Sequence, residues 1–354
     1  MISSMRLRNF RGFEDIELSD MCPITLISGR NNVGKSAILE AVFLFFDHKA
    51  PDSFEKINLF RGNYMLNYSS NLWESLFYQM DMGRTMQIEM GLDDTSAILK
   101  YTRDSSFVPI YNTTMPKEIR NDIIMSAKSK YTLRFQYAMG DYIEEGHFVA
   151  GQAGIFQNMT TNQENRVELM PYIQFINNRR MFDVAIIDDF GAIEMQQKKQ
   201  DVIDIMQMID KNIQDISTIS THGQASLYVK TNDHLLPLNL MGDGTSKLLC
   251  LVVSIISHPN SIFLVDEIEG GFHYSMYPKL WEIIATIARK YACQIIATTH
   301  SYECIVGAID GIESADRKHE FCYFRINKNN GKNRVYRYSH DILCTAIDGE
   351  MEVR

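Results

Sequence analysis

The chain has 354 residues, which is enough for one large domain or two ordinary ones. Its composition, 45% hydrophobic and 22% charged, is that of a globular protein and excludes low-complexity and fibrous classes. Asp and Glu outnumber Lys and Arg by 44 to 35, so the formal charge of −9 argues against nucleic-acid binding through bulk charge and leaves only a local basic groove.

The sequence predicts neither a membrane span nor a secretion signal, because no apolar run is long enough and residues 1–6 lack the pattern of a leader. The cysteines form no C-x-x-C pair and mostly lie in apolar runs, as expected of buried thiols in a reducing compartment. They are Cys22, Cys250, Cys293, Cys304, Cys322 and Cys344. We therefore expect a cytoplasmic protein that does not contact membranes.

The first elements along the chain lead into a glycine-rich loop. Met5–Phe13 alternates as a half-buried strand, and Phe13–Leu18 alternates similarly and would pair with it. The apolar run Ile24–Ile27 predicts a buried strand that enters the loop, and Ala37–Phe46 predicts a helix, apolar nearly all round, that leaves it.

The loop itself, Gly29–Ser36, fits the pattern G-x-x-x-x-G-K-[ST] of a phosphate-binding loop. Glycines let the backbone turn sharply and direct its N–H groups at an anion, and the helix N-terminus that follows adds positive potential. Lys35 would reach the β- and γ-phosphates, and the Ser36 hydroxyl would bind Mg²⁺. The predicted nucleotide contacts in this loop are Gly29, Asn31, Asn32, Val33, Gly34, Lys35 and Ser36.

The middle of the chain changes period twice. A loop-rich stretch, Lys49–Ser70, precedes a predicted helix around Leu72–Met80, and the period then shifts toward two from Thr85 to about Gly151, which indicates an antiparallel sheet. The predicted strands are Met86–Met90, Ala97–Tyr101, Tyr131–Tyr137, Tyr172–Ile176 and Ala225–Val229. Before the last of these, Phe190–Ile216 follows a helical period, with an interruption at Gln196–Gln200 that would join two helices.

The segment Leu240–Lys247 places glycines and hydroxyls directly before the apolar helix Leu248–Ile256. Such a sequence caps a helix and makes an anion-binding N-terminus. By itself the segment is equally typical of an ordinary helix cap.

A continuous apolar run, Ser261–Val265, predicts a strand buried on both faces of a parallel sheet, and it ends in Asp266 and Glu267. Carboxylates at this end of a strand lie where such sheets bind ligands. Asp266 would bind Mg²⁺ through water, and Glu267 would polarise the water that attacks ATP. A second buried strand, beginning at Ala292, ends in Thr298-Thr299-His300-Ser301, where His300 could hydrogen-bond the γ-phosphate or the attacking water.

Taken together, these motifs resemble the ABC-type ATPases of the SMC/RecF/OLD group. The resemblance rests on the phosphate loop, Gly242-Asp243-Gly244-Thr245-Ser246, the Asp266–Glu267 pair, Glu269–His273 and Thr298–Ser301, and Leu7–Phe13 is similar to the first strand of that group. Tyr338–Leu343 and Glu352–Arg354 resemble its OLD-like branch. The resemblance covers Met1–Phe46 and Leu235–Arg354, and the middle third matches only in general plan.

The resemblance implies an α/β fold: a P-loop ABC-ATPase head with a mixed or parallel core sheet, an antiparallel β subdomain and a helical insertion. The implied segments are 1–84 for the first part of the core, 85–234 for the β subdomain and insertion, and 235–354 for the rest of the core. It further implies Mg²⁺-dependent ATP hydrolysis by a homodimer, or a higher assembly of dimers. Each ATP would lie between Gly29–Ser36 of one subunit and the signature of the other.

Within that signature the implied nucleotide contacts are Gly242, Asp243, Gly244 and Ser246. Glu269–His273 would be the loop that crosses the dimer interface, and His300 the switch histidine. The signature departs from Leu-Ser-Gly-Gly-Gln, and no Q-loop glutamine is assigned beyond the candidates Gln79 and Gln87.

Several functions are compatible with these motifs. The leading hypothesis is an ATPase whose dimerisation controls a partner effector, a nuclease or toxin, because the chain resembles ATPase subunits of two-component anti-phage systems and Tyr302–Arg354 leaves no room for a TOPRIM nuclease. The alternative is a RecF- or SMC-type repair ATPase that binds DNA, with Arg6, Arg8, Arg11, Arg179 and Arg180 as candidate phosphate contacts. A transporter nucleotide-binding domain and a small-molecule kinase share the phosphate loop but fit the remaining motifs less well.

Overall fold

The computed structural model describes residues 1–62, 71–93, 95–107, 121, 132–151, 154–161, 170–177, 184–221, 224–329 and 331–354. Two compact units are each assembled from separate stretches of the chain. The first comprises Met1–Met21, Asn31–Met170 and Ile326–Val335, and the second Cys22–Arg30, Pro171–Arg325 and Tyr336–Arg354. These units do not follow the segment boundaries at residues 84 and 234, which stay a prediction.

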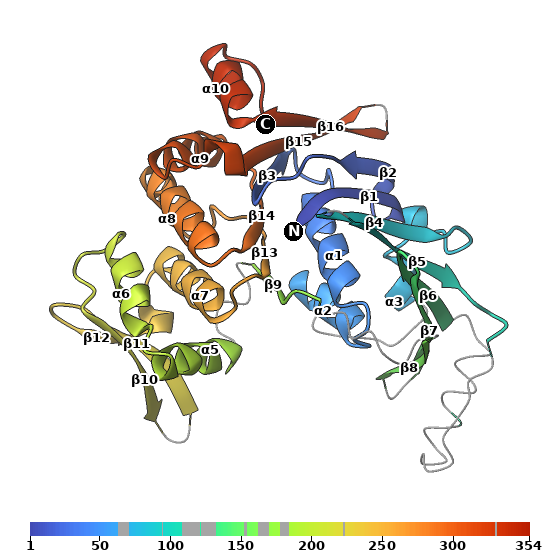
Figure 1. Cartoon of the computed structure of the whole chain (residues 1–354), viewed down its shortest axis with the longest axis horizontal. Coiled ribbons are helices and arrows are strands. Elements are labelled where there is room, and N and C mark those ends of the chain that lie inside the picture. The colour runs from blue at the N-terminus through green and yellow to red at the C-terminus, as the bar shows by residue number, and fades with distance from the viewer. Residues whose placement is uncertain are drawn as a thin grey trace. The chain divides into compact units, whose positions relative to one another are not determined.

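The first unit is built on a seven-stranded antiparallel sheet in the order β2-β1-β4-β5-β6-β7-β8 (Figure 1). Its strands are β1 (Ile2–Phe10), β2 (Phe13–Leu18), β4 (Met86–Leu92), β5 (Thr95–Arg103), β6 (Thr132–Met139), β7 (Tyr142–Gly151) and β8 (Gly154–Thr161). Buried and less buried residues alternate along β1 and β4. The period-two pattern therefore predicted the antiparallel sheet correctly, although Tyr131 lies outside the described residues and β8 was not predicted.

Short helices pack on this sheet within the first unit: α1 (Lys35–Phe46), α2 (Ser53–Phe60), α3 (Asn71–Glu74) and η1 (Tyr78–Met80). The ring of Phe45 on α1 meets Tyr137 of β6 at 5.7 Å, and Phe54 on α2 meets Phe148 of β7 at 5.3 Å. The expectation of a loop over Lys49–Ser70 is wrong at Ser53–Phe60, which forms α2. This helix forms because Phe54 and Ile57 lie one helical turn apart and are both buried. Residues 63–70 lie outside the described part.

The helix expected at Leu72–Met80 is also shorter than predicted. The chain leaves α3 after Glu74 so that Phe77 can form a β-bridge with Phe10. The side chains of Trp73, Leu76 and Phe77 are nevertheless buried, as the core spacing indicated.

The second unit contains most of a six-stranded sheet in the order β16-β15-β3-β14-β13-β9, and parts of β15 and β16 belong to the first unit. Its strands are β3 (Ile24–Gly29), β9 (Ile173–Ile176), β13 (Ile262–Val265), β14 (Gln294–Thr298), β15 (Phe321–Asn329) and β16 (Lys332–Ser339). Strands β3, β14, β13 and β9 are parallel neighbours, with Thr298 opposite Ile27 and Val265 opposite Ala297. The carboxyl ends of these four strands therefore meet at one edge of the sheet.

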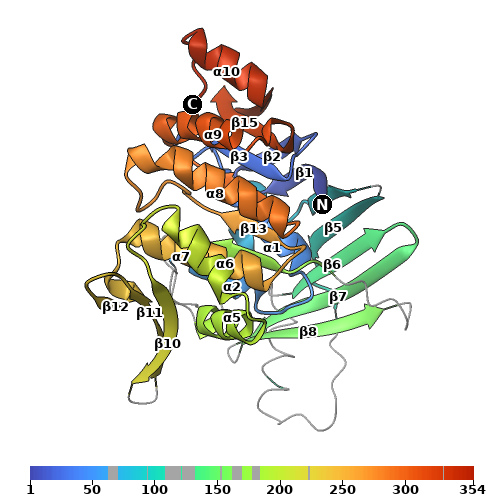
Figure 2. The ribbon, with the colours of Figure 1, turned by 60° about the vertical axis from the view of Figure 1, so that its left-hand side comes forward.

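In the same unit α8 (Tyr277–Lys290) lies between α7 (Asp243–Ser257) and α9 (Tyr302–Ser314) (Figure 2). The remaining elements are α5 (Val184–Met195), α6 (Lys199–Gln207), α10 (His340–Asp348), β10 (Asp215–Thr221), β11 (Gln224–Lys230), β12 (Leu235–Pro237), η2 (Leu238–Leu240), η3 (Tyr274–Met276) and η4 (Lys318–Glu320). No helix in the described ranges is long and apolar enough to cross a bilayer.

The helical pattern expected over Phe190–Ile216 is only partly correct. Two helices with a break at 196–198 are present, as predicted, but the chain is already a strand at Ile216. Ile213 and Ile216 are fully buried in the core that α7 shares with β10 and β11. Ile216 lies opposite Val229 of β11, so pairing with a strand further along the chain decides its conformation.

Two buried ionic clusters hold α1 in the first unit. Glu40, 1% exposed, accepts hydrogen bonds from Arg11 Nε at 3.0 Å and from Arg61 Nε at 2.5 Å. Directly after α1, Lys49 Nζ lies 2.9 Å from Glu144 Oε2, and the His48 ring stacks on Tyr137. The helix that carries Lys35 and Ser36 is thus anchored along its length.

Glu144 makes the second cluster sensitive to acid. Burial would raise the pKa of Glu144, but the contacts with His48 and Lys49 outweigh it and lower that pKa from 4.5 to about 2. Because the folded-state pKa lies below the unfolded one, ionised Glu144 stabilises the fold above pH 4.5, and this contribution is lost as the pH falls toward 2.

The free energy of unfolding of the unmodified protein should fall between pH 4.5 and 2. We expect this fall to be smaller in Glu144→Gln by about 3 kcal/mol, because one pKa unit corresponds to about 1.4 kcal/mol. Urea unfolding at a series of pH values measures this difference, with the exposed Glu350→Gln as the control. Parallel curves for Glu144→Gln and the unmodified protein would contradict the assignment.

Candidate active site

The parallel strands of the second unit bring the ends of three predicted motifs to one sheet edge. β3 ends at Gly29, β13 ends directly before Asp266, and β14 ends directly before Thr299 and His300. This edge is where α/β sheets bind ligands.

The phosphate loop continues from this edge and passes from the second unit, at Arg30, into the first, at Asn31. Its backbone has positive φ at Gly29 (146°), Asn32 (64°) and Gly34 (101°), and α1 begins at Lys35. Repeated left-handed residues before a helix turn successive N–H groups toward the same side, which is the geometry of an anion-binding nest.

Gly34 is required by packing as well as by its backbone. A Cβ there would lie 2.4 Å from a ring carbon of Phe13, which is fully buried at the start of β2. Phe13, part of the Leu7–Phe13 segment that carried the family resemblance, therefore supports the loop within the first unit.

Thr298 links the two strand ends that carry the acidic pair. Its hydroxyl donates to Asp266 Oδ1 at 2.5 Å and accepts from the backbone N–H of Glu267 at 3.0 Å. Glu267 is exposed and adopts a left-handed backbone conformation, with φ of 48°. One fully buried hydroxyl thus orients both Asp266 and the backbone of Glu267, a role that the sequence did not predict.

The donors expected to hold Mg²⁺ are of the right chemical kind. The Ser36 hydroxyl and the Asp266 carboxylate are oxygen ligands, and Mg²⁺ commonly takes one or two protein groups together with phosphate oxygens and water. No group of three His, Cys, Asp or Glu side chains able to hold a metal occurs in the described residues. Such a cluster is not needed for a metal that the nucleotide itself helps to bind.

The signature segment packs against the loop that follows Asp266–Glu267. A Cβ on Gly244 would lie 2.5 Å from Gly271 O, and Gly271, at φ 85°, has equally little room beside Gly244 N. Gly242 and Asp243 stay exposed at the start of α7, whereas Ser246 is buried and donates to Leu238 O at 2.8 Å. The Ser246 hydroxyl therefore makes its hydrogen bond within the same subunit, and its contact with nucleotide stays a prediction.

Lys247 is a functional candidate that the sequence did not single out. It is 3% exposed, and its Nζ donates to the backbone oxygen of Glu267 at 2.7 Å. Burial lowers the pKa of Lys247 to about 8, against the opposing attraction of Glu269, Asp266 and Glu267. A lysine directly after a glycine-rich cap was the available signal, but only the fold shows that it reaches the acidic loop.

His300 is paired with Glu269. The His300 side chain is 52% exposed, and its Nδ1 lies 2.9 Å from Glu269 Oε1, which also accepts from the His300 backbone N–H at 2.8 Å. Glu269 itself is buried. The predicted interface loop Glu269–His273 therefore starts at a buried residue, whereas His273 and the following Tyr274 are exposed.

Two family models and several known proteins match the chain. Residues 1–147 match a family model described as an AAA ATPase domain. Residues 155–305 match a second, an AAA domain whose description names the AbiEii toxin of a type IV toxin–antitoxin system. The chain is 25% identical over 351 residues to an ATP/GTP phosphatase of Helicobacter pylori, covering 91% of this chain and 92% of that protein. The protein is an ATPase.

Solved structures show the fold of this ATPase. An SMC head bound to the C-winged helix domain of ScpA matches with a TM-score of 0.53 at 12% identity, over 96% of this chain and 98% of that one. An Smc head with an extended coiled coil, bound to the C-terminal domain of ScpA from Pyrococcus furiosus, matches with a TM-score of 0.52 at 10% identity, over 99% of both chains. The predicted α/β head with a mixed sheet and an antiparallel subdomain is thereby confirmed.

A short stretch of the chain also matches a DNA-repair ATPase. Over 76 residues, 22% of this chain, the ATPase is 37% identical to the DNA double-strand break repair Rad50 ATPase of Archaeoglobus fulgidus, of which those residues cover 8%.

Thr298 provides a test of the acidic pair. We expect Thr298→Val, which keeps the shape and removes the hydroxyl, to lower ATP turnover by about 10- to 100-fold, as is typical when a hydrogen-bond partner that orients a functional side chain is lost. Thr298→Ser retains the hydroxyl and should keep most of the activity. Steady-state ATPase assays at several Mg²⁺ concentrations measure both variants. Equal activity of the Val and Ser variants would show that the hydroxyl does not matter.

Proposed function

We propose that this ATPase uses Gly29–Ser36, Asp266 and Glu267 to bind and hydrolyse Mg²⁺-ATP, and that ATP closes a homodimer in which the signature of each subunit contacts the nucleotide of the other. Closure would control a partner effector, a nuclease or toxin, in anti-phage defence. The chain would then be an OLD-like ATPase subunit that acts inside the cell.

The observation that carries the dimer is the surface around the start of α7. Gly242 and Asp243 are exposed there, and the Gly244–Gly271 contact joins them to the exposed His273 and Tyr274. Leu240 and Tyr274 are 68% and 63% exposed. A second copy that brings a γ-phosphate to this N-terminus would cover both side chains and supply the anion.

The chemistry assigned to each residue follows from its position. Lys35 would neutralise the phosphates, Mg²⁺ held by Ser36 and Asp266 would stabilise the charge that develops on them, and Glu267 would orient and deprotonate the attacking water. His300 would contact the γ-phosphate or that water. A signature N-terminus supplied by the partner would complete the neutralisation, so hydrolysis would weaken the dimer.

Glu267→Gln tests the catalytic assignment. We expect ATP binding to persist while turnover falls by about 10²- to 10⁴-fold, the usual cost of losing a general base. The ATP-bound variant should therefore accumulate as a dimer, measured by light scattering after size exclusion. The exposed Glu313→Gln is the matched control. A normal rate of hydrolysis in Glu267→Gln would refute the assignment.

Gly242→Glu tests the trans contact without disturbing the fold. Gly242 is exposed and a Cβ there meets nothing within 4 Å, so a side chain can be added, but its carboxylate would repel the partner's γ-phosphate. We expect ATP to bind normally while ATP-dependent dimerisation and turnover are lost. Gly191→Glu, at another position with open space, is the control. Unchanged dimerisation of Gly242→Glu would rule out the proposed interface.

The effector role has support in the comparisons, because one matched domain model names a toxin and the matched SMC heads are bound to another protein, ScpA. The test uses Glu267→Gln as bait, because its closed dimer should persist. We expect a tagged bait expressed in the native host to recover an effector, and deletion of the gene to increase phage plating. Failure of both results would contradict this role while leaving the ATPase assignment intact.

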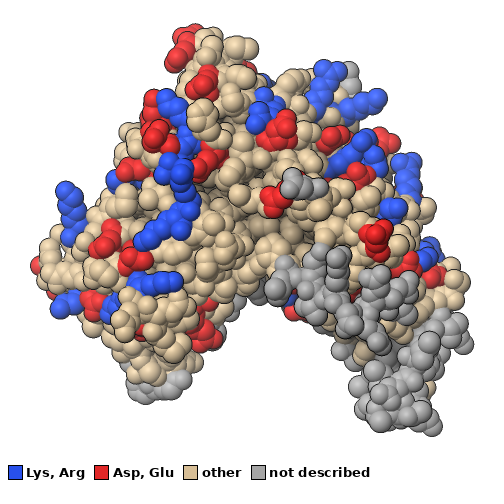
Figure 3. Space-filling model, in the orientation of Figure 1, with Lys and Arg blue, Asp and Glu red and all other residues tan. Residues whose placement is uncertain are grey.

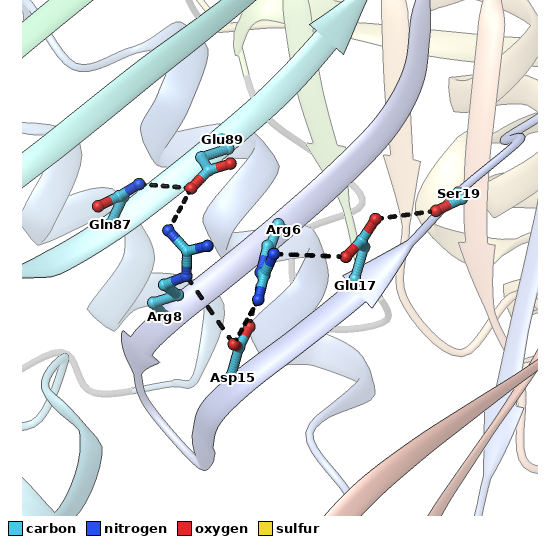
Figure 4. Close-up of polar contacts among 7 residues, drawn as sticks. All are labelled: Arg6, Arg8, Asp15, Glu17, Ser19, Gln87 and Glu89. Atoms are coloured by element: carbon cyan, nitrogen blue, oxygen red, sulfur yellow. Dashed lines mark hydrogen bonds and ion pairs between the residues drawn. The ribbon is translucent and has the colours of Figure 1, made fainter.

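The DNA-binding alternative is less well supported, because the three candidate arginines among the described residues are paired with carboxylates. Arg6 forms two hydrogen bonds to Asp15, at 2.9 and 2.7 Å, and Arg8 Nη1 lies 2.6 Å from Glu89 (Figure 4). Arg11 is committed to buried Glu40, and Arg179 and Arg180 lie outside the described residues. Figure 3 shows blue and red side chains interspersed on the face it presents. Salt-sensitive, ATP-dependent DNA binding would revive this alternative.

A further inference from the structure

Two cysteines of the second unit lie in contact and have no role in the mechanism above. Cys322, the second residue of β15, is fully buried, and Cys22, two residues before β3, is partly exposed. The backbone N–H of Cys22 donates to Cys322 Sγ at 3.2 Å. A hydrogen bond with the Cys22 side chain, together with burial, raises the pKa of the Cys322 thiol. The two cysteines therefore meet although they are 300 residues apart along the chain.

The main chain at this point suits a covalent link between the two sulfurs. β3 and β15 are neighbours in the six-stranded sheet, and neighbouring strands lie about 4.8 Å apart. Disulfides join residues whose Cα atoms are about 4.4–6.8 Å apart. The carbonyl oxygen of Cys22 accepts hydrogen bonds from Thr25 Oγ1 at 2.9 Å and from Gln294 Nε2 at 3.2 Å. Cys22 is thus held beside the strand that carries Cys322, at a spacing that a disulfide can bridge.

Cys22 has the surroundings of a cysteine that reacts with oxidants. Its Sγ lies 3.8 Å from Nη2 of Arg337, an exposed residue of β16. The thiolate is the nucleophilic form of cysteine, and a guanidinium beside the sulfur stabilises its negative charge. Cysteines that sense oxidants are accessible to solvent and often lie next to a second, resolving cysteine. Cys22 combines partial exposure, a cationic neighbour and a second thiol.

We propose that Cys22 and Cys322 form a peroxide-sensitive dithiol, a reversible oxidation site that closes as a disulfide within one chain. The Cys22 thiolate attacks one oxygen of hydrogen peroxide, the O–O bond breaks, and Cys22 becomes a sulfenic acid as hydroxide leaves. The Cys322 sulfur then attacks the Cys22 sulfur, the S–O bond breaks, and the hydroxyl leaves as water with the proton of Cys322. The two sulfurs lose two electrons, which the peroxide gains. A thiol reductant restores both cysteines by exchange.

Packing alone explains only one of the two cysteines. Free cysteine behaves in a core as a small apolar residue, which accounts for the buried Cys322. It does not account for Cys22, which is partly exposed and contacts a guanidinium. The pair also lies at the opposite end of β3 from the phosphate loop, because Cys22 precedes this strand and Gly29 ends it. The oxidation site is therefore independent of the proposed ATP mechanism.

The test treats the fully reduced ATPase with a small excess of hydrogen peroxide and then unfolds it in N-ethylmaleimide, which blocks the remaining thiols. We expect the protein to lose two of its six thiols. A non-reducing digest should yield one peptide that links Cys22 to Cys322, and dithiothreitol should restore both thiols. Survival of both thiols, or a disulfide that joins two chains, would overturn the proposal.

Two variants separate the steps of the reaction. Cys322→Ser removes the resolving thiol, so the oxidation should stop at the sulfenic acid of Cys22, which dimedone traps for mass spectrometry. Cys344→Ser, at another partly exposed cysteine, is the control and should still form the link between Cys22 and Cys322. A Cys322→Ser protein whose Cys22 gains no dimedone would contradict the assigned order of attack.

Arg337→Gln tests the cationic neighbour. We expect this variant to lose its thiols about two- to fivefold more slowly, the size of effect typical of an exposed charge interaction. Arg334→Gln, which removes another exposed arginine of β16, is the matched control and should react at the normal rate. Equal rates in the two variants would refute the role given to Arg337.

Discussion

The hydrogen bond between Thr298 and Asp266 is the contact on which the active-site edge depends. It joins the ends of two neighbouring parallel strands, β14 and β13, and the same hydroxyl holds the backbone of Glu267. Because parallel strands end at the same edge, one short side chain can fix the Asp266 carboxylate and the backbone of Glu267 beside it. Glu267 can then stay exposed to water in a left-handed backbone conformation that costs free energy by itself.

Two buried charged side chains connect the strand ends to neighbouring segments. Lys247 reaches back from the signature helix to the backbone of Glu267, and Glu269 reaches across to His300. Such groups contribute little to stability, because their desolvation offsets most of the attraction between them. Lys247 connects α7 to the loop after β13, and Glu269 connects that loop to the residue after Thr299. The close Gly244–Gly271 contact leaves little slack between these two segments.

The helix that carries Lys35 is stabilised in a different way. Glu40 is surrounded by Arg11 and Arg61, and aromatic rings of α1 and α2 interlock with the antiparallel sheet of the first unit. Arg6 and Arg8 on β1, two of the candidates for DNA contact, are paired with carboxylates on β2 and β4. In the strand register Arg8 lies opposite Asp15 and Arg6 opposite Glu89, and the close pairs Arg6–Asp15 and Arg8–Glu89 join diagonal neighbours.

The sequence by itself determined the motifs, the parallel and antiparallel sheets and the ATPase chemistry, because glycine spacing, period-two alternation and continuous apolar runs are local properties that report directly on backbone and burial. It failed at Ser53–Phe60, where a single pair of apolar residues one turn apart is too short a pattern to indicate a helix, and at Ile216, where pairing with Val229 of β11 makes the chain a strand. Only the tertiary structure decided that Thr298, Lys247 and Glu269 contact the acidic pair and His300. Their partners lie between 20 and 32 residues away along the chain, and a hydrogen bond across that separation exists only once parallel strands and the signature helix have packed together.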